Sequence, residues 1–184
     1  DDAFQHRSIK RNFDILLINV NQNFSECLPY GQLREPLKNI NRADCIVFTK
    51  SSSLSNVPNL IANSDIPVFK AQESFQPSNS SRSGVAFCGI GDPNSFIKTL
   101  EKLSIKINGF IFFKDHQKYD KLSIDKVESL LIKNNQTHFF TTQKDWVKLP
   151  DSFLNKYSGT YVEMDVSVQD SRFQDLLIKK IIPS

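Results

Sequence analysis

The sequence lacks most features that would assign it at once to a class of proteins. Its three cysteines are far apart among 184 residues, so neither a disulfide framework nor zinc-ligand spacing is present, which favours a reducing compartment. No apolar run approaches the roughly 18 residues of a membrane-spanning helix. The formal net charge is only +3, so charge alone predicts no nucleic-acid partner. One large or two small cytosolic domains fit these absences.

Glycine motifs that bind phosphate are also missing. No Gly-x-x-x-x-Gly-Lys-Thr/Ser segment occurs. Gly89-Ile90-Gly91 has no third glycine, because Asn94 stands in its place. Asp92 would also put a negative charge where a pyrophosphate binds, so a dinucleotide-binding turn is excluded.

Apolar runs alternate with helical patterns along most of the chain. Strands are predicted at 13–20, 45–49, 67–70, 85–88, 110–113, 138–142 and 161–166. Helices are predicted to begin at Asp92-Pro93 and at Ser123, and a last helix carries Phe173 to Ile181. This alternation predicts an α/β fold, with three α/β/α layers and a mostly parallel sheet.

A composition change divides the chain into two predicted domains. Residues 73–83 are rich in Ser, Asn, Pro and Gln and are predicted as a linker. The first α/β unit would then be 1–72 and a smaller one 84–184. Packing of the last helix back onto the first unit is left open.

The first candidate site is the acidic pair Asp1-Asp2, followed by Gln5. Two carboxylates at a strand end can bind Mg²⁺ that bridges nucleotide phosphates. A solvated or helix-capping pair is the ordinary alternative, and the dipeptide by itself favours that alternative.

The second candidate is Arg34-Glu35, in a segment that follows the loop signal Pro29-Tyr30-Gly31. Arginine donates hydrogen bonds in pairs to phosphate, and the glutamate can hold a metal-bound water. A surface ion pair beside a helix start is the alternative.

Two further polar segments follow predicted strands, where sites of α/β proteins gather. His116 lies between Asp115 and Tyr119 and can carry a proton, or it can be a loop histidine. The segment from Thr141 to Asp145 is either a polar site edge or a helix cap.

Taken in order, the motifs resemble those of the tetraacyldisaccharide 4'-kinase family, the lipid A 4'-kinases. The shared motifs are Asp-Asp-Ala-Phe-Gln-His-Arg, Leu-Arg-Glu-Pro-Leu, Arg-Ala-Asp, Phe-Cys-Gly-Ile-Gly-Asp-Pro, Asp-His-x-x-Tyr and Thr-Thr-x-Lys-Asp. The resemblance covers nearly the whole chain from Asp1 to about Leu149, and it matches the C-terminal part of the family.

The resemblance implies a P-loop kinase domain, of which 1–72 is a remnant, joined to a second α/β domain. It implies transfer of the ATP γ-phosphate to the 4'-hydroxyl of tetraacyldisaccharide 1-phosphate in lipid A biosynthesis. ATP and Mg²⁺ are the implied cofactors, and the lipid A disaccharide precursor is the implied partner. The implied location is the cytoplasmic face of the bacterial inner membrane, with peripheral contact.

The resemblance also implies residue roles. Asp1 and Asp2 match the acidic pair at the Mg²⁺-ATP site, with Gln5 beside them. Arg34 matches a catalytic arginine that faces the phosphates, and Glu35 belongs to its network. His116 matches a histidine that pairs with an aspartate base, which this sequence does not contain.

Because the phosphate loop and that aspartate are absent, we expect these 184 residues alone to show no kinase turnover. The missing N-terminal half of the same protein would be the needed partner. The alternative hypothesis is a non-catalytic α/β relic or partner-binding module.

Overall fold

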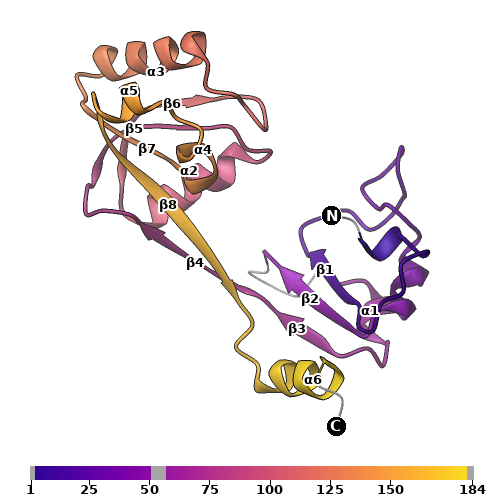
Figure 1. Ribbon diagram of the computed structural model, residues 1–184. Coiled ribbons are helices and arrows are strands. Elements are labelled where there is room, and N and C mark those ends of the chain that lie inside the picture. Colours follow the sequence, from indigo (N-terminus) through magenta and orange to yellow (C-terminus); the bar gives the residue numbers. More distant parts are fainter. Residues whose placement is uncertain (1–2, 51–56, 182–184) are drawn as a thin grey trace. The chain divides into compact units, whose positions relative to one another are not determined.

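The computed structural model describes residues 3–50 and 57–181, which form two compact units. Unit 1 contains the described parts of Asp1–Glu73 and Val166–Ser184, and unit 2 is Ser74–Asp165. The chain passes from one unit to the other within strands β4 (Gln72–Pro77) and β8 (Ser158–Ser167) (Figure 1). The stretch at 73–83, expected as a linker, thus contains most of a sheet strand.

Unit 1 is built on a parallel sheet of three strands in the order β1-β2-β3. The strands are β1 (Ile15–Asn19), β2 (Cys45–Thr49) and β3 (Val68–Lys70). The central strand β2 is apolar at every position except its end, because both of its faces are covered.

Helical segments cover the two faces of this sheet. They are η2 (Leu37–Arg42), α1 (Asn59–Ala62) and α6 (Ser171–Ile181). The turn η1 (Ala3–Gln5) precedes β1 in the sequence and has no buried residue. Ile46 and Phe48 of β2 share a cluster with η2 and α1. Cys45 and Val47, which alternate with them, share another with Phe173 of α6.

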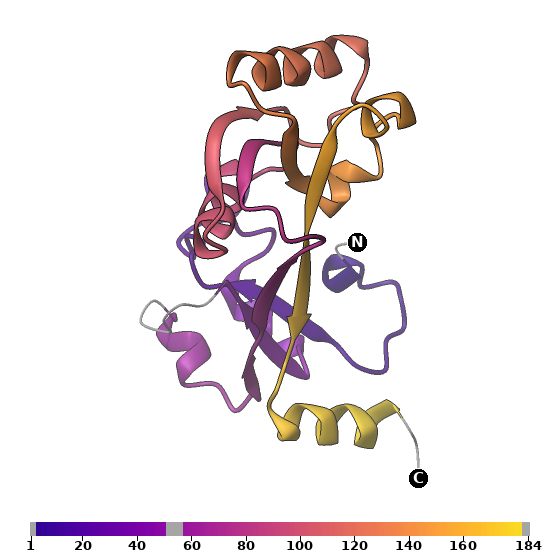
Figure 2. The same ribbon diagram turned by 90° about the vertical axis from the view of Figure 1, so that its left-hand side faces the viewer.

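Unit 2 has a five-stranded sheet in the order β4-β8-β7-β5-β6. Its other strands are β5 (Ser83–Cys88), β6 (Lys106–Phe112) and β7 (His138–Thr142). The pairs β5–β6, β5–β7 and β7–β8 are parallel. In Figure 2 β4 runs alongside the long strand β8, its neighbour in the sheet.

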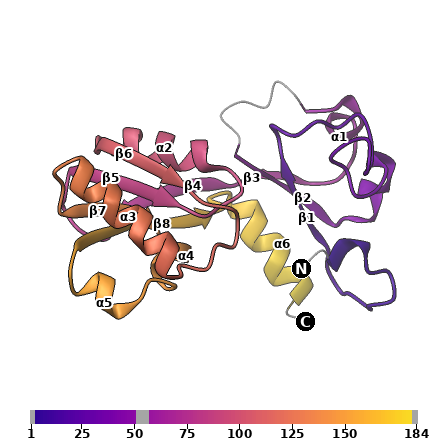
Figure 3. The same ribbon diagram turned by 90° about the horizontal axis from the view of Figure 1, so that it is seen from above.

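The helices of unit 2 lie on both faces of its sheet. They are α2 (Pro93–Lys102), α3 (Lys121–Lys133), α4 (Gln143–Trp146) and α5 (Asp151–Leu154). Figure 3 shows α2 on one face and α3 on the other, and the cores agree, since Phe96 and Val127 belong to different clusters. The predicted three-layer α/β fold with mostly parallel sheets is confirmed.

The N-terminal caps of α2 and α3 test the capping residues that the sequence predicted. The Asp92 side chain accepts a hydrogen bond from the Ser95 amide at 3.2 Å, and Pro93 occupies the first turn, as predicted. Ser123 was the wrong cap for α3, because Asp120 caps it. The Asp120 carboxylate accepts from both the amide and the hydroxyl of Ser123, at 2.9 and 2.7 Å.

Among the described residues, no helix is long and apolar enough to cross a membrane.

One of the two core clusters of unit 2 is rich in aromatic rings. The ring of Phe139 lies 5.4 Å from that of Phe87, 5.1 Å from that of Phe153 and 5.6 Å from that of Trp146. Phe139 is fully buried and contacts residues from β5, α4 and α5.

We predict that Phe139→Ala lowers the free energy of unfolding of unit 2 by about 3–5 kcal/mol, because it leaves a cavity in this cluster. Urea unfolding followed by far-UV circular dichroism measures the change. Phe112→Ala is the matched control, since Phe112 is 67% exposed, and it should cost less than about 1 kcal/mol. Equal losses in the two variants would contradict the assigned core.

Candidate functional site

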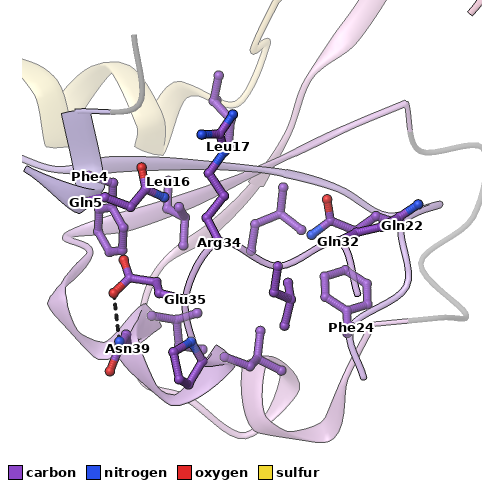
Figure 4. A pocket seen from close by; sticks show the side chains of 15 residues that line it. Phe4, Gln5, Leu16, Leu17, Gln22, Phe24, Gln32, Arg34, Glu35 and Asn39 are labelled. Carbon is purple, nitrogen blue, oxygen red and sulfur yellow. Dashed lines mark hydrogen bonds between the residues drawn. The ribbon is translucent and has the colours of Figure 1, made fainter. Parts of the chain in front are cut away.

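Unit 1 contains a half-open pocket of about 260 Å³ beside the first strand. Residues from η1, from β1 and from the segment that leads into η2 form its walls (Figure 4). Its lining includes Phe4, Gln5, Leu16, Leu17, Ile18, Gln22, Phe24, Gln32, Leu33, Arg34, Glu35, Pro36, Leu37, Asn39 and Ile40. Three of the predicted site residues therefore meet here, Gln5, Arg34 and Glu35.

Arg34 and Glu35 are neighbours in sequence, but their side chains turn different ways (Figure 4). Arg34 is exposed and extends toward Leu17, and Gln5 lies on the same side. The side-chain oxygen of Gln5 is buried and has no hydrogen-bond partner within the described part of the chain. An arginine fork and an amide oxygen that needs a donor suit a polar ligand in this pocket.

Glu35 is engaged in a local network instead of facing the pocket alone. Its Oε2 accepts a hydrogen bond from Asn39 Nδ2 at 2.7 Å, and its Oε1 accepts from Arg42 Nη2. Its side chain is only 18% exposed. Glu35 thus fixes the segment that carries Arg34, which is a positioning task.

Arg42 is the residue of this site whose role the sequence did not reveal. Its guanidinium stacks on the Phe4 ring, 4.3 Å from the centroid, and Nη1 donates to the Phe4 carbonyl oxygen at 3.2 Å. Arg42 therefore links Glu35 to the turn η1, which carries Gln5. The sequence signal for Arg42 was its place at the start of the shared Arg-Ala-Asp motif, which does not name its partners.

The expected metal ligands cannot be placed. Asp1 and Asp2 lie outside the described residues. Within residues 3–50 and 57–181, no three His, Cys, Asp or Glu side chains gather as metal ligands. The described residues by themselves therefore do not form a magnesium site.

His116 belongs to unit 2, at the edge where β5, β6 and β7 end. Its side chain is 76% exposed, and its Nε2 lies 3.9 Å from Asp115 Oδ2. Its backbone adopts a φ of 58°, and its amide donates to Asp115 Oδ1 at 2.9 Å. Lys144 Nζ approaches the same carboxylate, at 3.9 Å. The Asp115 carboxylate is thus approached by both the imidazole and the ammonium, and the exposed imidazole can exchange a proton with a substrate group.

Asp145 lies beneath this edge, and it is the only charged residue that is buried among those described. Its Oδ2 accepts hydrogen bonds from the Gly89 amide and the Thr142 hydroxyl, both at 2.8 Å. Its Oδ1 accepts from Lys148 Nζ at 3.2 Å. Thr142 is the N-cap of α4, so of the two alternatives for 141–145 the helix cap is observed.

The buried carboxylate influences nearby groups. Burial, followed by the charge of Asp145, raises the pKa of the Cys88 thiol to about 12. The same two causes, in the same order, raise the pKa of Tyr119. Both groups therefore stay protonated at neutral pH.

Fold and pocket together define an α/β protein whose mostly parallel sheets present polar groups at strand ends. The family model described as tetraacyldisaccharide-1-P 4'-kinase matches residues 1–182. The chain therefore belongs to the tetraacyldisaccharide 4'-kinase family, as the motifs predicted.

Individual relatives agree with this assignment. The tetraacyldisaccharide 4'-kinase of Chlorobaculum parvum is 33% identical, over 83% of this chain and 46% of the relative. The enzyme of that name from Syntrophobacter fumaroxidans is 31% identical, over 96% of this chain and 52% of the relative. The chain spans about half the length of the curated relatives it matches.

One solved structure shares the fold over nearly all of the chain. It is a crystal structure of LpxK from Aquifex aeolicus in complex with ATP, with a TM-score of 0.70 and 28% sequence identity. The match covers 96% of this chain and 55% of that chain. ATP is thus the ligand of a structural relative.

We predict that Arg42→Ala speeds amide hydrogen exchange at residues 4–9 by tenfold or more, because the turn loses its stacking and its hydrogen bond. Exchange measured by mass spectrometry or NMR checks this, with β2 amides as the internal reference. Arg7→Ala is the matched control: Arg7 also reaches Glu35, at 3.4 Å, but is 66% exposed. The assigned network is wrong if both variants exchange alike.

Proposed function

We propose that the protein is an ATP-dependent kinase that phosphorylates the 4'-hydroxyl of a tetraacyldisaccharide 1-phosphate, a lipid A precursor. The observation that carries the proposal is the family match over residues 1–182. The ATP complex of the Aquifex aeolicus relative supports ATP as the phosphate donor. When bound, ATP supplies the phosphoryl group that is transferred.

The residues of the unit 1 pocket fit a phosphate-bearing ligand. Arg34 would bind phosphate oxygens with its planar fork. Gln5 offers a buried amide oxygen that can accept a hydrogen bond from a hydroxyl or amino group of the same ligand, whose phosphate oxygens are themselves acceptors. Glu35 and Arg42 hold the two backbone segments from which these side chains project. Binding and orientation are thus the tasks of this pocket, and phosphoryl transfer depends mainly on such positioning.

Mg²⁺ is proposed on Asp1 and Asp2, since paired carboxylates are ordinary magnesium ligands. The described residues contain no such cluster, so the proposal rests on the sequence of this pair. Bound magnesium would offset negative charge on the phosphates.

His116 is proposed to hold or pass a proton at its imidazole, paired with an aspartate that these 184 residues do not supply. Its exposure leaves the ring free to meet other groups, and its Nε2 lies 3.9 Å from Asp115 Oδ2. We also propose action at the cytoplasmic face of the inner membrane with peripheral contact, because the substrate is acylated.

We expect the full-length gene product to transfer radiolabelled phosphate from ATP to tetraacyldisaccharide 1-phosphate, and to lose this activity in EDTA. The Chlorobaculum parvum kinase serves as the positive control. Arg34→Ala should lower kcat/KM by about 10²–10³-fold, as expected for one lost charge-stabilising contact, with Arg34→Lys in between. Absence of transfer while the control enzyme is active would favour a binding role instead.

His116→Ala in the same protein should lower kcat by about 10²–10⁴-fold if the imidazole takes part in proton transfer. Steady-state kinetics at saturating ATP measures the change. Lys118→Ala, an exposed cation two residues away, should leave kcat within about twofold. An unchanged kcat for His116→Ala would contradict the proposed proton transfer and favour the alternative, a loop histidine without a catalytic role.

A further inference from the structure

The ends of β5, β6 and β7 are tied together at one buried point in unit 2. Asp145 follows β7 and accepts a hydrogen bond from the amide of Gly89, the residue directly after β5. The amide of Phe113, directly after β6, donates to the Cys88 carbonyl oxygen at 2.8 Å. Three segments that are distant in sequence thus meet within hydrogen-bond distance.

Gly89 also packs against the loop that carries His116. A Cβ atom built at Gly89 would lie 2.9 Å from Gln117 Cβ and 3.1 Å from the Lys114 carbonyl oxygen. The same position is 3.4 Å from Asp145 Oδ1. The loop of Lys114 to Gln117 therefore packs directly against the backbone that Asp145 holds.

Burying a carboxylate without water is costly unless its lone pairs are used. Asp145 uses them on two donors of its own segment, Thr142 and Lys148, and on one donor from a distant segment, Gly89. Capping α4 does not require this, because the Thr142 hydroxyl already accepts from the Asp145 amide at 3.1 Å. Beyond the helix start, the hydrogen bond from the Gly89 amide is the contact of this carboxylate that reaches a segment distant in sequence.

We infer that Asp145 is a positioning residue that sets, through Gly89, the place of the loop carrying His116. The inference rests on the proposed role of His116 in the kinase reaction. Asp145 does not touch the reacting atoms in this account. It fixes a left-handed loop residue whose imidazole must keep one location, and small displacements of a catalytic group lower rates steeply.

The test uses the full-length gene product with two perturbations of the same contact. Asp145→Asn leaves one acceptor where the carboxylate offered two. Gly89→Ala places a methyl group against Gln117. Each should lower kcat about tenfold or more, while KM for ATP stays within about twofold. Each should also shift the Hε1 resonance of His116 in the NMR spectrum.

Gly91→Ala is the matched control, because its Cβ would meet only Asp115 Oδ2, at an ordinary 3.5 Å. Val127→Ala controls for general destabilisation, since Val127 is fully buried in the core of the same unit. Both should leave kcat and the His116 resonance close to those of the parent protein. Thermal unfolding of all variants confirms that they are folded under assay conditions.

A double-mutant cycle separates this inference from the proposed function. In the His116→Ala background, Asp145→Asn should lower kcat no further, because its effect passes through His116. An additional loss there overturns the inference, as does an unshifted His116 resonance in both Asp145→Asn and Gly89→Ala. An unchanged kcat in His116→Ala, with the resonance still shifted in those variants, overturns only the proposed catalytic role of His116.

Discussion

Parallel strand pairing is the constraint on which the candidate sites depend. In a parallel sheet the carboxyl ends of neighbouring strands lie at one edge, so the segments that follow them converge. Pairing of β5 with both β6 and β7 does this in unit 2. Gly89, the His116 loop and Asp145 are far apart in sequence, yet all three follow these strands. The sheet brings the segments together, and the buried carboxylate fixes their detailed positions.

In unit 1, contacts of charged side chains, and not strand pairing, hold the segments that line the candidate site. The turn η1 belongs to no strand, and few apolar contacts anchor it, since none of its residues is buried. Arg42 anchors this turn by stacking on Phe4 and bonding to its carbonyl oxygen, while Glu35 holds Arg42 in place. A partly buried ion pair of this kind adds little net stability, because the cost of desolvating the two charges offsets much of their attraction. The conformation that it defines brings Gln5 and Arg34 to the same pocket.

The predictable parts of the fold were those specified by local physics. Continuous apolar runs predicted β2 and β7 within a residue, and Asp92-Pro93 predicted the start of α2. Asp120 and Ser123 are both good capping residues three positions apart, so only the hydrogen bonds of the folded chain distinguish them. Strand β4 was missed because its composition is that of a loop, and it owes its extended form to pairing with β8, distant in sequence.

The site residues could likewise be predicted from the sequence where local signals mark them, whereas their contacts with distant segments could not. Arg34 and His116 were recognisable as polar groups next to predicted structure, whereas the partner of Glu35 depends on how the chain turns through η2. Asp145 is the sharpest case. Its sequence neighbours Thr142 and Lys148 suggest an exposed cap, and a solvated aspartate there would need nothing more. Burial of the Asp145 carboxylate is compensated in part by a hydrogen bond from the backbone amide of Gly89, which follows a different strand. A charge that is buried through a contact with a distant glycine is a product of tertiary structure, and no window of sequence around Asp145 contains it.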